Sequence, residues 1–575
     1  MLETVILTAA LAAAPAPSPD LTGAYLERYF AFYPSRATAA GRHDFDGALE
    51  DFSPEAVAAW VTYNREVAAA LRERLAAAGG PRHDRPDALD HELLLRQAEE
   101  ELAAFSTLER HRTSPLFWTG VPANATVFLL VRDDLPRAER LAAAAERAAA
   151  IPRLAAQARE TLGAADPARI APELATIAAR QARASATFYR EGFARVAAGE
   201  EEALAGRLTT AGAAAASALE ELAAFLDALA GKATGSPRLG EEAYGLLFRL
   251  HTGLDDPPAK VASEAEAALA AKRAEAAAYA REVWPCYFPE EEPPADDRAL
   301  LARMFDRVEE DHAASVEEFV TDYRELVAQA AAFVRERGVV TLPGELTVRT
   351  DRSPSYFVGQ SVGGVYPAGP YAPEADTLFY LPTPPDSATP GEREAFFRDF
   401  NHHFNVMIVP HEIVPGHYLQ LKHAARHPRK VRSLFGDGVF IEGWGTFCER
   451  LMLDLGWGDP LARLAHLKKQ MENIARTVVD VRVHTAGMAR EEVLRFVRED
   501  ALQDEQFAGN MWTRAITSSP QLTSYWLGYR RVMGLYEEVR AARGEAFELR
   551  AFMDGLMELG PVPVRHHRER LLETP

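Results

Sequence analysis

Two histidines with a glutamate beside the first form the stretch of the sequence best suited to chemistry. His411, Glu412 and His417 lie close together, and a second carboxylate, Glu442, follows after one further predicted helix. Two imidazoles and one carboxylate are the ligands of a zinc site that keeps a fourth position open for water. We therefore interpret His411, His417 and Glu442 as metal ligands and Glu412 as the general base.

The spacing of the two histidines requires a break in the helix that carries them. In the common His-Glu-x-x-His motif the imidazoles are four residues apart and share one helix face. Six residues of an ideal helix rotate by roughly 600° and rise by about 9 Å, which separates the two rings. Pro415 lacks a backbone N–H, and Gly416 tolerates unusual backbone angles. We expect the helix to end or widen there and to turn His417 back toward His411.

The alternative to a metal site is a pair of core histidines, each satisfied by one hydrogen bond. Glu442 favours the metal site, because Gly443 after it allows another backbone segment to approach closely. The Pro-Gly pair between the histidines also favours the metal site. The donor set would also accept manganese, iron or cobalt in place of zinc.

Three motifs resemble those of a known bacterial family. HEIVPGHYLQ at 411–420, EGWGTFCERLM at 442–452 and SSPQLTSYWLG at 518–528 are similar to segments of the domain-of-unknown-function 885 family. The resemblance implies a zincin-like metallopeptidase, similar in outline to angiotensin-converting enzyme and thermostable carboxypeptidase. It implies one zinc ion per chain on His411, His417 and Glu442, with Glu412 as the catalytic carboxylate.

The third motif supplies a candidate catalytic hydroxyl. A helix that begins at Pro520, with Ser519 as its N-cap, would place Gln521 and Tyr525 on one face. The resemblance implies that Tyr525 donates a hydrogen bond to the oxyanion of the tetrahedral intermediate, and a core tyrosine is the alternative.

Four further polar residues are candidates for support or substrate binding. Arg514 or Arg530 could bind a substrate carboxylate, which would make the protein an exopeptidase, and the sequence does not choose between them. Asp480 and His484 share a face at the end of a predicted helix over residues 461–483. Asp480 either orients a histidine near the metal or forms a helix-end pair with His484.

Short strands are predicted just before the metal helix, over residues 339–342, 346–348 and 377–381, where β-branched and aromatic residues gather. The last of these contains Tyr380. The resemblance suggests that such a strand offers its edge to an extended peptide substrate. A packed strand with no substrate role is the alternative. Residues 392–406 are then predicted as the helix that leads to the motif.

The chain before these strands is predicted to be a succession of helices rich in Ala, Leu, Glu and Arg. The predicted helices span residues 54–78, 88–108, 135–162, 172–198, 204–230, 259–283 and 297–337. We predict a mainly α-helical, zincin-like fold with a few short strands. A deep central cleft would separate an N-terminal helical part (residues 21–338) from a metal-site part (residues 339–575), the two forming one catalytic unit.

Composition and charge exclude some partners. The 575 residues are 48% hydrophobic and 26% charged, which is ordinary for a globular protein, and the net charge is −21. Nucleic acids and anionic membranes bind basic surfaces, so neither is expected as a partner. The two cysteines, Cys286 and Cys448, are expected as buried thiols rather than as a disulfide.

The first twenty residues resemble a signal peptide, with an apolar run at 5–14 and a Pro- and Ala-rich exit. The basic start is replaced by Glu3. A secreted or periplasmic location is favoured, a disordered N-terminus on a cytoplasmic protein is the alternative, and no later stretch predicts a membrane span.

These observations predict a zinc-dependent hydrolase that cleaves peptide or similar amide bonds with water as the nucleophile. The alternatives are hydrolysis of a non-peptide amide or ester by the same site, and a catalytically inactive binding protein on the same fold.

Overall fold

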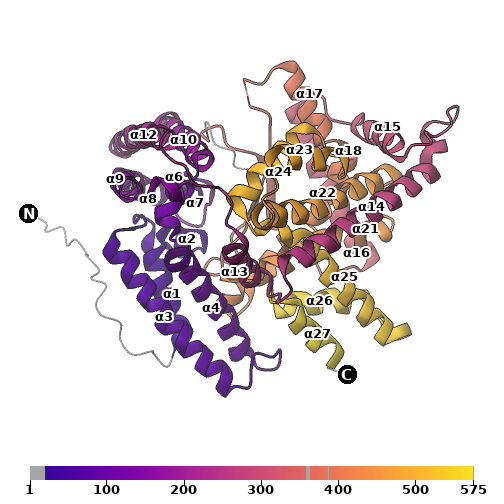
Figure 1. Cartoon of the computed structure of the whole chain (residues 1–575), viewed down its shortest axis with the longest axis horizontal. Helices are drawn as coiled ribbons and strands as arrows, with labels where there is room; N and C mark the ends of the chain where they lie inside the picture. The colour runs from indigo at the N-terminus through magenta and orange to yellow at the C-terminus, as the bar shows by residue number, and fades with distance from the viewer. Residues whose placement is uncertain (1–19, 358–362, 386, 574–575) are drawn as a thin grey trace, which may run out of the picture. The chain divides into compact units, whose positions relative to one another are not determined.

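A computed structural model of the protein describes residues 20–357, 363–385 and 387–573, and it is mainly helical, as predicted (Figure 1). The signal-like segment at residues 1–19 lies outside the described residues. The chain forms two compact units, one made of residues up to 81, 85–131 and 137–234, and one made of residues 82–84, 132–136 and 235 onward. The boundary suggested by the sequence, after residue 338, falls inside the second unit.

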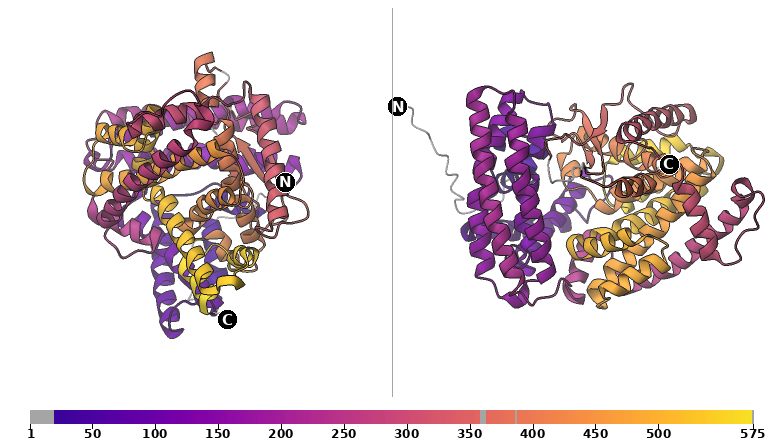
Figure 2. Two further views of the ribbon diagram at one scale, coloured as in Figure 1. Left: turned by 90° about the vertical axis from the view of Figure 1, so that its right-hand side faces the viewer. Right: turned by 90° about the horizontal axis from the view of Figure 1, so that it is seen from above.

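The first unit is a set of packed helices. Among them, α10 and α12 lie side by side (Figure 2) and meet through small buried residues such as Ala178, Ala182 and Ala215. Residues 135–162 were predicted as one helix but form two, because Pro152 begins a new helix. The longer helices of this unit are α1 (Leu21–Phe32), α3 (Pro54–Ala77), α4 (Pro86–Leu102), α6 (Pro115–Asn124), α8 (Arg137–Ala149), α9 (Ile151–Gly163), α10 (Pro172–Thr187) and α12 (Glu202–Ala230).

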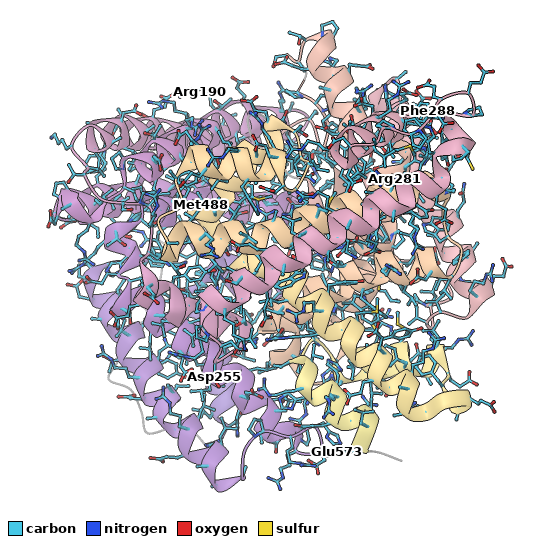
Figure 3. The ribbon with its side chains drawn as sticks, turned by 45° about the vertical axis from the view of Figure 1, so that its right-hand side comes forward. Arg190, Asp255, Arg281, Phe288, Met488 and Glu573 are labelled. Carbon is cyan, nitrogen blue, oxygen red and sulfur yellow. The ribbon has the colours of Figure 1, made fainter. Side chains whose placement is uncertain are left out.

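The second unit opens with long helices that pack on one another. Helix α14 lies along α22, and Asp255 and Phe288 mark its two ends in Figure 3. Residues 297–337 were predicted as one helix but form α15 and α16, because the Ser315 hydroxyl caps a new helix by accepting from the Glu318 N–H at 3.1 Å. The helices up to the sheet are α13 (Glu241–Thr252), α14 (Pro258–Tyr287), α15 (Asp297–Glu309) and α16 (Val316–Arg337).

The helices after the sheet carry the three sequence motifs. Residues 392–406 were predicted as one helix but form parts of α17 and α18, because Asn401 caps α18 by accepting from the Phe404 N–H. The bounds are α17 (Pro390–Asp399), α18 (His402–Glu412), α19 (His417–Arg426), α21 (Gly438–Asp454), α22 (Pro460–Thr485), α23 (Arg490–Glu499), α24 (Glu505–Ser518), α25 (Ser524–Arg543), α26 (Leu549–Leu559) and α27 (Val564–Glu573).

A small sheet lies between α16 and α17 in the sequence. Its described strands are β1 (Val348–Arg352), β2 (Gly364–Tyr366) and β3 (Thr377–Leu381), in the order β1–β3–β2, parallel between β1 and β3 and antiparallel between β2 and β3. Strand β3 was predicted, whereas residues 339–342 form no strand. Tyr323 of α16 stacks on Phe379 with ring centroids 5.4 Å apart, which packs the sheet on the helices.

The two cysteines are both free, but only Cys448 is buried, so the prediction of a second buried thiol at the exposed Cys286 is wrong. Within the described parts of the chain, every helix is too short or too polar to cross a membrane.

Candidate metal centre

The backbone breaks between the two motif histidines. Helix α18 ends at Glu412, Ile413 leaves the helical region at φ −115° and ψ −84°, and α19 begins at His417. A Cβ atom at Gly416 would overlap the His411 carbonyl, so only glycine fits this turn. The predicted break at Pro415 and Gly416 is therefore confirmed.

This turn brings the three predicted ligands together. The rings of His411 and His417 have centroids 4.6 Å apart. Glu442 Oε2, from α21, lies 3.7 Å from His411 Nε2 and 3.6 Å from His417 Nε2. The candidate donor atoms all lie within 4.8 Å of one another. Two donors on one tetrahedral zinc ion are roughly 3.4 Å apart, so the three side chains fit such an ion with small adjustments.

A fourth residue, Glu449, holds the first histidine in place. His411 Nδ1 donates to Glu449 Oε1 at 2.7 Å, and His466 Nδ1 donates to Glu449 Oε2 at 3.0 Å. Because the ionised carboxylate only accepts, His411 carries a proton on Nδ1, and Nε2 is the nitrogen that is left to face a metal. Glu449 was not predicted as a site residue from the sequence, although it lies seven residues after Glu442 and so on the same face of α21.

The charges at this centre are strongly coupled. Burial acts to raise the pKa of Glu442, but hydrogen bonding from His411 and His417 holds it well below its usual range. Burial also acts to raise the pKa of Glu449, whereas its bonds to His411 and His466 lower it to about 2. Both carboxylates are therefore ionised. The ionised Glu442 is suited to bind a cation, and the ionised Glu449 is suited to accept from imidazole N–H groups.

Close helix contacts fix the position of α21, which carries Glu442. A Cβ at Gly443 would overlap the backbone of Gly528 on α25, and a Cβ at Gly445 would lie 2.8 Å from the His411 ring. Trp444 Nε1 donates to the carbonyl of Pro415 at 2.9 Å, which ties α21 to the turn between the histidines. Glycine is thus required at two points where α21 meets its neighbours.

The third motif places three polar residues beside Glu442. Arg514 Nη2 donates to Gln521 Oε1 at 2.8 Å, and this contact orients the amide, because Arg514 can only donate. Gln521 Nε2 then lies 3.3 Å from Glu442 Oε1 and 3.2 Å from the Tyr525 hydroxyl. Arg514 Nη2 also reaches the Tyr525 oxygen at 3.4 Å. The phenol oxygen accepts from both neighbours, which leaves its own proton to donate.

The start of this motif differs from the prediction. Ser519 directly follows the last residue of α24 and is not the N-cap of α25. A single 3₁₀ turn (Gln521–Thr523) precedes α25. Gln521 and Tyr525 nevertheless share a face, as their 3.2 Å contact shows.

Asp480 and His484 lie close together at the end of α22, but they are not hydrogen-bonded to each other. Asp480 Oδ1 lies 4.0 Å from His484 Nε2, which instead donates to the Ala515 carbonyl at 2.9 Å. His484 Nδ1 accepts from the Leu239 N–H at 3.1 Å, so backbone groups satisfy both ring nitrogens. Burial raises the pKa of Asp480 to about 7. Among the described contacts of the candidate ligand His411, the carboxylate that orients the ring is Glu449 and not Asp480.

Two other candidates point elsewhere. Arg530 pairs with Glu264 at 3.1 Å on a half-exposed surface and lies over the Trp526 ring. Tyr380 packs against Tyr366, while its neighbours Phe379 and Leu381 face the cavity described next. Of the two arginines considered for carboxylate binding, only Arg514 lies beside the centre.

The centre opens into a cavity of about 660 Å³ within the second unit. His411, Glu412, His417, Glu442 and Tyr525 all line it. Its other walls are largely apolar, with Phe319, Tyr323, Val365, Phe379, Leu381, Phe400, Phe404, Ile408, Leu421, Ile441 and Phe507 among the lining residues. A cavity of this size suits a small organic molecule or a few residues of a peptide.

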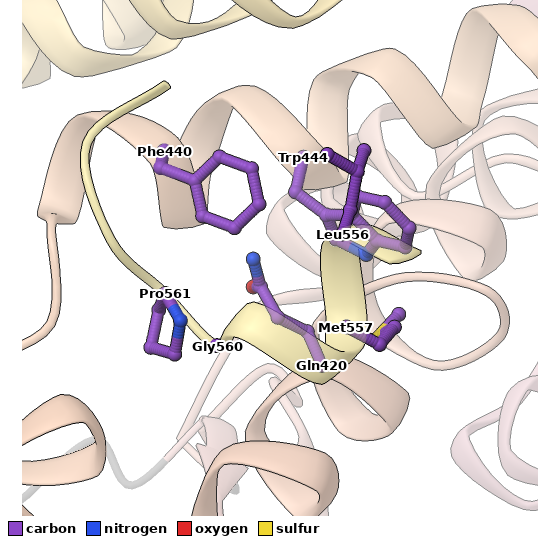
Figure 4. A pocket seen from close by; sticks show the side chains of 7 residues that line it. All are labelled: Gln420, Phe440, Trp444, Leu556, Met557, Gly560 and Pro561. Atoms are coloured by element: carbon purple, nitrogen blue, oxygen red, sulfur yellow. The ribbon is translucent and has the colours of Figure 1, made fainter. Parts of the chain in front are cut away.

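A second, smaller hollow lies close to α19. Figure 4 shows the Gln420 amide pointing among Phe440, Leu556 and Pro561, with Trp444 and Met557 also in the wall. The hollow has no space for a water-sized molecule, so it is a packing gap beside α19.

Comparisons with known proteins agree with this fold. A family described as "Bacterial protein of unknown function (DUF885)" matches residues 34–571. Two solved structures, both described as putative lipoproteins, are similar over nearly the whole chain. The one of unknown function from Shewanella oneidensis has a TM-score of 0.78 and 25% identity, and covers 97% of this chain and 100% of its own. The one from Colwellia psychrerythraea has a TM-score of 0.72 and 16% identity, and covers 96% and 99%. No curated protein matches the chain.

Proposed function

Since the chain belongs to the bacterial DUF885 family, whose description states no activity, we propose a function from the site itself: metal-dependent hydrolysis of peptide or similar amide bonds. The observation that carries the proposal is the convergence of His411, His417 and Glu442 within 4.8 Å at the wall of a 660 Å³ cavity that Glu412 also lines. Zinc is the proposed ion, held by the Nε2 atoms of both histidines and by Glu442. A bound zinc ion would polarise the scissile carbonyl and acidify a water molecule.

The remaining residues have distinct roles in this proposal. Glu412 takes a proton from the attacking water and passes it to the leaving amine. Tyr525, whose oxygen accepts from Gln521 and Arg514, donates its proton toward the developing oxyanion. Glu449 holds His411 in the tautomer that leaves Nε2 unprotonated. Water is the nucleophile, so no covalent enzyme intermediate forms.

Strand β2 offers a place for an extended substrate. It lies at one edge of the sheet, since β3 pairs with it on one side only among the described strands. Gly364 and Val365 of β2 line the same cavity as the candidate metal ligands. A peptide that pairs with this edge would place alternate side chains against the apolar walls.

A digest of a peptide library tests the proposal. The zinc-loaded protein should cleave peptides, and both chelation and the Glu412→Gln variant should abolish cleavage. Glu412→Gln should retain zinc, since Glu412 is not a ligand, and full activity in that zinc-bound variant would refute the assigned base. A panel of small esters and amides run in parallel would identify a non-peptide hydrolase.

A zinc-loaded protein that turns over nothing in either panel would favour an inactive binding protein on the same fold.

The two similar structures described as lipoproteins support a location outside the cytoplasm for this chain.

A further inference from the structure

The cavity that holds the candidate metal centre also has a basic wall. Lys469 and Arg476, two turns apart on α22, both line it. Their side chains are only 13% and 11% exposed, so each cation is largely removed from bulk water. Buried cations are rare unless an anion compensates them.

The two cations share one acidic partner among the described ion pairs. Lys469 Nζ lies 3.0 Å from Glu472 Oε2, and Arg476 pairs with the other oxygen of the same carboxylate. Arg476 Nη1 also donates to the neutral Asn473 amide at 3.0 Å. A third cation, Arg514, lies near enough to help lower the pKa of Glu472. Lys469 and Arg476 therefore share one bonded carboxylate.

The other carboxylates near this wall have their own partners or roles. Glu449 is bonded to His411 and His466, and Glu442 faces the two candidate ligand imidazoles. Burial first, and Arg476 second, lower the pKa of Lys469 even though Glu472 bonds it. Lys469 and Arg476 thus share Glu472 as their bonded carboxylate, and a substrate carboxylate in the cavity would offer both a further acceptor.

The basic wall lies beside the residue proposed to stabilise the oxyanion. The Arg476 guanidinium stands 4.5 Å from the centre of the Tyr525 ring, and Arg514 contacts the Tyr525 hydroxyl at 3.4 Å. An anionic group bound by Lys469 and Arg476 would therefore be part of the molecule whose amide bond is cleaved.

We propose that Lys469 and Arg476 bind a carboxylate of the substrate, so that the protein selects peptides with a carboxylate a short distance from the cleaved bond. The inference rests on the hydrolase function proposed above. The carboxylate comes either from the peptide's C-terminus or from an acidic side chain. Lys469 and Arg476 are specificity residues in this account and take no part in the bond-breaking steps.

Three versions of each cleaved peptide test the proposal: the free acid, its C-terminal amide, and an amide with glutamate as the last residue. The wild type should have a KM about 10- to 100-fold lower for the acid than for the simple amide, as expected for loss of charge-assisted hydrogen bonds. If only the acid has the low KM, the C-terminus is the source, and if only the glutamate amide has it, the side chain is the source. If both have it, the wall accepts a carboxylate from either source.

Two variants and a control assign the preference to the wall. Lys469→Met and Arg476→Gln should each remove most of the ratio between acid and amide, chiefly through KM. Arg482→Gln removes a cation from the same helix but outside the cavity, where Arg482 pairs with Glu266, and should keep the ratio. Equal KM values for the acid, the simple amide and the glutamate amide in the wild type, or unchanged KM ratios in both cavity variants, would overturn the proposal.

A binding measurement separates this proposal from the hydrolase function. Calorimetric titration of the zinc-loaded Glu412→Gln variant with the acid, the simple amide and the glutamate amide needs no turnover. Tighter binding of the acid or of the glutamate amide than of the simple amide would support the basic wall even if no peptide is cleaved, whereas equal affinities of all three would refute it while leaving the hydrolase function intact.

Discussion

Glu449 Oε1 lies 2.7 Å from His411 Nδ1, although the two residues are 38 positions apart in the sequence. The carboxylate is completely buried and takes its second hydrogen bond from His466. This contact leaves His411 Nε2 to face Glu442 and His417. The candidate centre therefore depends on a residue that touches none of the cavity.

We predict that Glu449→Gln weakens zinc binding by about 10- to 100-fold, because the amide cannot accept from two imidazoles as a carboxylate does. Competition with a chromophoric chelator would measure the affinity. The matched control is Asp454→Asn on the same helix, where Asp454 pairs with Arg450 near the surface. Equal zinc affinity in Glu449→Gln and the wild type would contradict the assigned role.

Tyr525→Phe should lower kcat by about 100- to 1000-fold with little change in KM, because it removes one oxyanion donor and little else. Steady-state kinetics on a cleaved peptide would test this prediction. An unchanged kcat would make Tyr525 a structural residue that merely contacts Arg514 and Gln521.

Gly528→Ala should destabilise the second unit by about 2 kcal/mol or more, since the new methyl group would overlap the Val439 carbonyl and push α21 from α25. Gly534→Ala on the same helix meets no atom within 4 Å. This control should raise stability by about 0.5–1 kcal/mol through helix propensity. Chemical denaturation of both variants would measure the difference, and equal stabilities would show that the two helices can separate without cost.

Acid should destabilise the protein partly through His567. This side chain is fully buried and stacks on Phe440 at 4.4 Å, and burial lowers its pKa to about 3. Below its unfolded pKa of about 6.5 the unfolded chain takes up a proton that the folded chain refuses. Stability from this residue is therefore full above pH 6.5 and falls as the pH drops toward 3.

The His567→Phe variant keeps the ring and removes the titration. Between pH 7.5 and pH 5.0 the wild type should lose about 2 kcal/mol more unfolding free energy than this variant, at about 1.4 kcal/mol per pH unit. Chemical denaturation at the two pH values gives the comparison. His402→Gln, at an exposed histidine, should match the wild type. The same loss in wild type and His567→Phe would exclude His567 as the source.

Local sequence patterns predicted the features that depend on local backbone chemistry. The Pro-Gly pair predicted the turn at residues 413–416, and Gln521 and Tyr525 were placed on one face. Contacts between distant segments left no such signal: Glu449 with His411, and Lys469 and Arg476 in the cavity wall. Helix breaks were missed where a single cap decides them, as at Asn401 and Ser315.

The central claim is that His411, His417 and Glu442 bind one metal ion. Its most direct test is the zinc content per chain, measured by inductively coupled plasma mass spectrometry after dialysis against zinc and removal of free metal. One zinc ion per chain is expected in the wild type and none in His417→Ala. A wild-type protein without zinc, or equal zinc in both proteins, would contradict it.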